Sequence, residues 1–164
     1  MPEENYQSTH KEINVHLESI RVNKAFLTTI EEMKGYLKGK SYFNADNLRF
    51  DAGQTSMTIN FTPDNLNKDE ALVLFTEARV LYNTNEHSGF VVAKSKMTFL
   101  GAIKWNENDV QNFLNQRAIE IMTPVLKKIT FLMYALFDSS EIIGMVPDLL
   151  ELAAKRVEGS HSED

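Results

Sequence analysis

The chain has 164 residues, a hydrophobic content of 43% and a formal net charge of -6 at pH 7. This length suits one cored domain and is too short for two comfortable ones, so we expect a single domain over residues 1–164 with residues 1–12 and 159–164 disordered. Lys and Arg form no basic run, which argues against nucleic acid or an anionic membrane as the main partner. Without cysteines, the chain has no disulfide framework, thiolate metal site or Cys nucleophile.

The start of the chain is polar. Residues 1–12 carry acids where a secretory signal peptide would have a basic start and an apolar core. No apolar run approaches the roughly 18 residues that a transmembrane helix needs. We therefore expect a soluble, cytoplasmic protein that does not insert into a membrane.

The first predicted strand lies at residues 13–22, where apolar residues alternate but change phase near Glu18 and Ser19. A β-bulge at this point explains the change of phase. An amphipathic helix is the competing interpretation, and the β-branched residues favour the strand.

Residues 28–53 are predicted to cross between strands and to include a helical turn. Thr28 with Glu31, or Thr29 with Glu32, has the spacing of a capping box. Two glycines follow within ten residues, and they weaken or end any helix that begins here.

Two further strands are predicted at residues 55–62 and 70–83. The first alternates apolar and polar residues up to Pro63 and a run of turn residues. The second is apolar on both faces over part of its length, which indicates a second covering layer that self-association could supply. Residues 83–89 close a hairpin into the next strand.

The strongest pattern runs over residues 89–137, where the apolar period changes from two to 3.6. Residues 91–105 alternate as one long strand, which needs a large surface on its apolar face. Asn108 with Gln111 predicts the start of a helix, and Pro124 predicts a kink. The apolar stripe of this helix comprises Val110, Phe113, Leu114, Ala118, Ile121, Met122, Val125, Leu126, Ile129, Leu132, Met133 and Leu136.

A second helix is predicted after a connector at residues 138–145. Pro147 opens it, and Asp148 is favourable at its positive end. The sequence therefore predicts an α+β fold, a four-stranded antiparallel meander packed by a long C-terminal helix and a second, shorter helix.

No motif in the chain points to catalysis, so we expect no enzyme, no cofactor and no metal site. The four histidines, His10, His16, His87 and His161, sit in separate segments without the spacing of a zinc site. There is neither a Gly-rich phosphate loop nor a Gly-x-Ser-x-Gly elbow. Carboxylate pairs stand at helix starts, where the helix dipole already explains them.

Four short patterns follow one another along the chain: Val15-x-Leu17-x-x-Ile20-x-Val22, Thr98-Phe99-Leu100-Gly101, Met122-Thr123-Pro124-Val125 and Met145-Val146-Pro147-Asp148-Leu149-Leu150. Together with the order of strands and helices, they resemble the SecB family of protein-export chaperones. The resemblance covers residues 13–156 and rests on order and spacing rather than on one specific motif.

The resemblance implies an ATP-independent holdase chaperone that binds unfolded or precursor polypeptides as a homotetramer, a dimer of dimers. Shallow apolar grooves with adaptable Met and aromatic contacts suit such clients. In the family the groove lies between the crossover segment and the last helix. Here its walls would be Tyr42, Phe43, Leu48 and Phe50 on one side and Val146, Leu149, Leu150 and Leu152 on the other.

One departure concerns the SecA motor, which the family docks through acidic residues on an exposed sheet face. The nearest positions here are Lys24, Thr28 and Lys94, which argues against docking of a SecA-type motor. The chain could equally be a divergent member of the family that protects other clients, such as the antitoxin of a toxin–antitoxin system. An oligomeric scaffold protein of the same fold without holdase activity competes with it. So does a hotdog-type small-ligand binder or enzyme, although hotdog chains place their helix before most strands.

Overall fold

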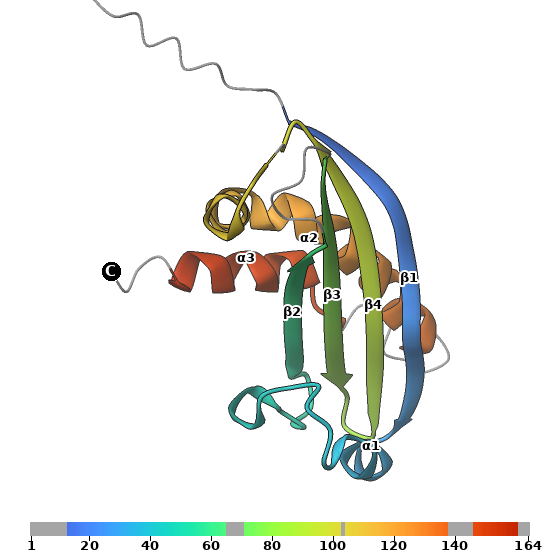
Figure 1. Ribbon diagram of the computed structural model, residues 1–164. Helices are drawn as coiled ribbons and strands as arrows, with labels where there is room; N and C mark the ends of the chain where they lie inside the picture. Colours follow the sequence, from blue (N-terminus) through green and yellow to red (C-terminus); the bar gives the residue numbers. More distant parts are fainter. Residues whose placement is uncertain (1–12, 65–70, 103, 138–145, 161–164) are drawn as a thin grey trace, which may run out of the picture.

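The computed structural model describes residues 13–64, 71–102, 104–137 and 146–160, apart from the side chains of residues 158–160. One sheet is covered on one side by two helices, and a short helix lies at one end of the sheet (Figure 1). This arrangement confirms the predicted α+β fold. The elements in chain order are β1 (Asn14–Thr29), α1 (Ile30–Leu37), the 3-10 turn η1 (Ala45–Asn47), β2 (Thr55–Pro63), β3 (Leu72–Asn83), β4 (His87–Leu100), α2 (Glu107–Phe137) and α3 (Leu149–Ser160).

The four strands are antiparallel and lie in the order β1-β4-β3-β2. The last three strands form a meander, whereas β1 pairs with β4, so the segment between β1 and β2 carries the chain from one edge of the sheet to the other. The predicted bulge is present between Leu17 and Ser19, and a second one follows between Val22 and Lys24. This second bulge lets β1 continue beyond its predicted end at Val22.

Helix α1 begins at one of the two predicted caps. The Thr29 hydroxyl accepts a hydrogen bond from the Glu32 amide at 3.3 Å, which satisfies one of the free donors of the first turn. Met33 and Leu37 are buried beneath the helix. Gly39 then adopts a φ of +74°, a left-handed conformation that suits glycine after a helix end.

Both faces of the central strands are buried at the hairpin end of the sheet. Val91 packs under α2, while the neighbouring Phe90 points to the opposite face, as successive strand residues must. There Phe90 and Leu81 are covered by α1 and by the crossover segment of the same chain. The second covering layer that the sequence predicted is therefore supplied here by this chain itself.

Strand β4 ends at Leu100, five residues before its predicted end. Gly101 (φ +97°) and Lys104 (φ +57°) turn the chain toward α2. The strand was predicted to reach Trp105 because the alternation of apolar residues in the sequence continues to that position. In the structure, the Trp105 ring lies beyond the strand and packs on Phe113 of α2 at a centroid distance of 5.1 Å. Ile103 lies outside the described residues.

The cap of α2 differs from the predicted one. The Asp109 amide donates to Asn106 Oδ1 at 3.0 Å, and the Asn106 amide donates to Asp109 Oδ2 at 2.9 Å. This reciprocal pair is a capping box that begins two residues before the predicted Asn108. Gln111 takes no part in it and donates to the Asn115 side chain at 3.0 Å.

The break in α2 lies at Arg117, where φ is -128° and ψ is 21°, rather than at Pro124. Phe113, before the break, packs in an apolar cluster around Phe99 to which Ile121 also belongs, and Leu126, further along the helix, packs in the main core. The helix continues through Pro124 although proline removes one amide donor and crowds the carbonyl four residues earlier. The buried neighbours Val125 and Leu126 hold this part of the helix in the core. Most of the predicted apolar stripe is buried.

Helix α3 begins directly after Asp148, whose carboxylate accepts from the amides of Leu150 and Glu151 at 3.0 and 3.2 Å. The helix continues to Ser160, so Gly159 and Ser160 are helical and not part of a disordered tail. The connector at residues 138–145 and the chain ends at 1–12 and 161–164 lie outside the described residues. Within the described part of the chain, no helix is long and apolar enough to cross a membrane.

Candidate functional site

The first predicted groove wall lies in an aromatic cluster on the sheet face opposite α2. Tyr42, Phe43, Leu48 and Phe50 are half-buried there. The ring of Phe90 contacts Tyr42 at a centroid distance of 5.4 Å and Phe43 at 5.9 Å. These contacts hold the crossover segment against β4.

Two lysines flank this aromatic cluster. The Lys40 ammonium lies 4.0 Å from the centre of the Tyr36 ring, and the Lys24 ammonium lies 5.7 Å from it. The Lys24 ammonium lowers the pKa of the Tyr36 phenol, and Tyr36 in turn raises the pKa of Lys24. Because cations flank the rings, the surface of the cluster is amphipathic rather than a continuous apolar groove.

The second predicted wall packs on the other face of the sheet. Val146 and Leu149 are buried in the main core against α2, and Leu150 and Leu152 are half-buried at its border. The two predicted walls thus lie in separate clusters on opposite faces of the sheet. A single chain does not bring them together, and client binding by either wall remains a prediction.

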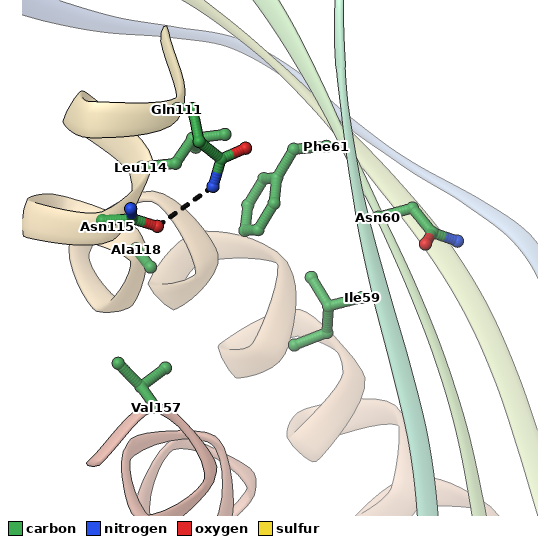
Figure 2. A pocket seen from close by; sticks show the side chains of 8 residues that line it. All are labelled: Ile59, Asn60, Phe61, Gln111, Leu114, Asn115, Ala118 and Val157. Atoms are coloured by element: carbon green, nitrogen blue, oxygen red, sulfur yellow. Dashed lines mark hydrogen bonds between the residues drawn. The ribbon is translucent and has the colours of Figure 1, made fainter. Parts of the chain in front are cut away.

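A different apolar surface runs along the edge strand β2, where the strand meets α2 and α3. A pocket of about 310 Å³ and a second of about 210 Å³ share Ile59 and Val157, so they form one trough. In Figure 2, Ile59 and Phe61 point from β2 toward the helices, and Val157 approaches from α3. We call this surface the β2 trough; its apolar lining comprises Met57, Ile59, Phe61, Leu114, Ala118, Met122, Ala153 and Val157.

The backbone of β2 adds hydrogen-bonding groups along the trough. The Asp64 amide donates to Val73 on β3 at 3.0 Å, which shows that the even-numbered residues of β2 pair with β3. By the antiparallel alternation, Met57, Ile59 and Phe61 direct their amides and carbonyls away from the sheet. In the described part of the chain, no strand pairs with this outer edge.

One outer carbonyl of β2 already has a donor. The Arg156 guanidinium on α3 donates to the Met57 carbonyl at 2.8 Å. Arg156 thus occupies the position that an amide of an added strand would take, and it anchors α3 beside the edge. Exchange of this side chain for a peptide amide would open the edge without leaving a buried group unsatisfied.

Polar amides lie at the mouth of the trough. Gln111 donates to Asn115 at 3.0 Å beside the Phe61 ring, whereas the Asn60 side chain points away from the helices (Figure 2). Neutral amides can both donate to and accept from a peptide backbone without selecting for charge. The trough is therefore suited to hold an extended, apolar polypeptide segment. No group of three His, Cys, Asp or Glu side chains that could hold a metal occurs within the described residues.

Little in the sequence indicates this trough. Ile59 and Phe61 fall in the strand predicted at residues 55–62, but its pattern does not show that β2 lies at the edge. That position follows from the pairing of β1 with β4, which joins residues 58 to 86 positions apart.

Comparison with known proteins finds likeness in structure but none in sequence. No protein-family profile and no curated protein matches the chain. A protein of unknown function from Streptococcus agalactiae is similar in structure, with a TM-score of 0.50 and 12% sequence identity over 79% of this chain and 91% of that one. The SecB-like chaperone Rv1957 of Mycobacterium tuberculosis, solved with a ChAD peptide from the antitoxin HigA1, gives a TM-score of 0.38 and 9% identity over 74% and 82%. The first likeness concerns the fold alone, and the second is too distant to carry an argument.

Proposed function

We propose that this protein is an ATP-independent holdase chaperone that binds extended apolar segments of unfolded polypeptides in the β2 trough. The observation that carries the proposal is the apolar trough beside an edge strand whose outer backbone groups face away from the sheet. An unfolded chain exposes apolar side chains and unpaired backbone amides, and an edge strand with side-chain pockets can bind both. Recognition through the backbone explains how one site would accept many sequences.

The proposed activity needs several troughs. Pockets of about 310 and 210 Å³ hold only a few side chains, so one trough alone gives a small interface and weak binding. We propose that a homotetramer, built as a dimer of dimers, presents several troughs to one client. Linked weak sites raise the overall affinity while each contact still exchanges readily.

The element order that resembles the SecB family supports the same proposal. We propose that the protein acts in the cytoplasm on precursor or other unfolded clients. The proposal includes neither a catalytic step nor docking of a SecA-type motor. An oligomeric scaffold without holdase activity is the competing function, and the following experiment separates the two.

The test uses light scattering of a reduced, aggregating client protein. The wild-type protein should suppress aggregation without ATP. The variant Val157→Asp places a charge in the half-buried wall of the trough, where an apolar client segment would have to desolvate it. We expect it to lose most of the protection while its melting temperature stays close to that of the wild type.

The matched control is Ala154→Asp, which adds the same charge to the same helix but outside the trough lining. It should protect the client as the wild type does. Full protection by Val157→Asp would remove the trough from the proposal, and no protection by the wild-type protein would favour the scaffold.

A further inference from the structure

A second pocket, of about 400 Å³, lies on the sheet face opposite α2, where the crossover segment does not cover the strands. Lys94 and Lys96 alternate along β4 with the buried residues that pack under α2, so their side chains share this open face. Residues of β1 and β3 complete the pocket. Its lining comprises Ser19, Arg21, Phe75, Lys94, Ser95 and Lys96.

Two cations are placed directly opposite each other in this pocket. Arg21 of β1 pairs in register with Lys94 of β4. Like charges at directly opposite positions destabilise a sheet, so this pair is unfavourable unless an anion lies between or above the two groups. The Lys94 ammonium also lies 5.5 Å from the centre of the Phe75 ring, which holds it at the floor of the pocket.

The acidic groups on this face are used by other partners. Glu18 forms an ion pair with Lys96 at 2.6 Å and accepts a hydrogen bond from Thr98. Glu77 is opposite Lys94 in the β3–β4 register, but its carboxylate pairs with Arg79 at 2.5 Å.

Within the described part of the chain, no carboxylate therefore forms an ion pair with Arg21 or Lys94. A protein with a net charge of -6 thus concentrates positive charge at one pocket.

We propose that this pocket is a docking site for an acidic peptide segment of a partner protein, whose carboxylates bind Arg21 and Lys94. A guanidinium binds a carboxylate through two parallel hydrogen bonds, and an ammonium adds a second charge-assisted contact. Phe75 offers an apolar surface for the methylene groups of Glu side chains. A long polyanion such as nucleic acid fits less well, because binding along its phosphates needs many clustered Lys and Arg residues, and this pocket offers only a few. This site is separate from the β2 trough and does not depend on the function proposed for it.

The test measures fluorescence anisotropy of a labelled peptide that contains two adjacent Glu pairs, at low ionic strength. A peptide with Gln in place of every Glu serves as the uncharged probe. We expect the acidic peptide to bind and the Gln peptide not to bind. The double variant Arg21→Gln with Lys94→Gln should weaken binding of the acidic peptide at least about tenfold, because it removes the charge-assisted bonds.

Two further variants sharpen this result. Lys127→Gln removes one positive charge, half the change of the double variant, from an exposed position on α2 and should change the affinity less than about twofold, as expected from long-range charge alone. Glu18→Gln frees Lys96 from its carboxylate partner and should increase the affinity.

Equal binding of the acidic peptide to the double variant, or equal loss in Lys127→Gln, would overturn the proposal. Tighter binding of inorganic phosphate or of single-stranded DNA than of the peptide would also overturn it, in favour of a general anion site. Client protection, measured on the same double variant, should stay at the wild-type level, which keeps this test independent of the holdase assay.

Discussion

Neighbouring leucines on α3 differ sharply in what they contribute to the protein. Leu149 is 0% exposed in the main core, whereas Leu150 and Leu152 lie at its border. Leu149→Asp would bury an unpaired carboxylate, and we expect it to lower the free energy of unfolding by about 3 kcal/mol or more. Leu150→Asp should cost clearly less, because its side chain can reach water.

Urea unfolding of both variants measures this difference. Equal destabilisation by the two substitutions would contradict the assignment of Leu149 alone to the core. Leu152→Asp in the client-aggregation assay would in addition test the C-terminal helix as a client-binding wall, since a partly exposed side chain can be changed with limited loss of stability.

Among the elements, α2 shows why the start of a helix depends on more than spacing. Both Asn106 with Asp109 and Asn108 with Gln111 have the spacing of a capping box, and the structure uses the first pair. Asn106→Ala should therefore lower the free energy of unfolding by about 1 kcal/mol, the usual effect of losing an N-cap side chain. Asn108→Ala, two positions further and exposed, should have an effect within about 0.5 kcal/mol. Chemical denaturation of the two variants measures both effects, and a larger loss for Asn108→Ala would show that the helix begins later.

The start or the end of an element was predictable from the sequence where a residue at that position determines it. Pro63 marks the end of β2, because it has no amide to donate, and Thr29 marks the start of α1, because its hydroxyl caps the Glu32 amide. The end of β1 was missed, since its second bulge shifts the phase again and imitates the end of a strand. The break at Arg117 was also missed, because arginine is an ordinary helix-forming residue and neither proline nor glycine stands beside it.

For the whole molecule, the alternation in each strand predicted which side chains share a face but not what covers that face. The resemblance to the SecB family implied that the aromatic residues around Tyr42 and the leucines around Leu149 form one groove, but in the single chain the sheet separates them. The β2 trough escaped prediction for the same reason. An edge strand is defined by which strands pair, and this depends on contacts between distant parts of the chain.

The single chain leaves apolar surface exposed on two elements, which predicts that it oligomerises. On the edge strand β1, Val15, Leu17 and Val22 are 38%, 40% and 39% exposed, and on α2 Phe131 and Tyr134 are 66% and 42% exposed. A 16-residue edge strand with apolar side chains is prone to pair with another chain unless it is covered. Two such surfaces are what a dimer of dimers requires, one for each kind of interface.

We therefore expect light scattering after size exclusion to give the mass of four chains at micromolar concentration. Leu17→Lys, on the edge strand, or Phe131→Lys, on α2, should each leave dimers, and both together should leave monomers, because a charge at an apolar contact must be desolvated on association. Lys127→Gln, which changes charge near Phe131 without touching an apolar residue, should keep the tetramer. If β1 and α2 instead contributed to one and the same interface, each single Lys variant would already give monomers, and a monomeric wild type would exclude the assembly altogether. Dimeric variants should also protect clients less well than the tetramer at equal chain concentration, since fewer linked troughs act on each client.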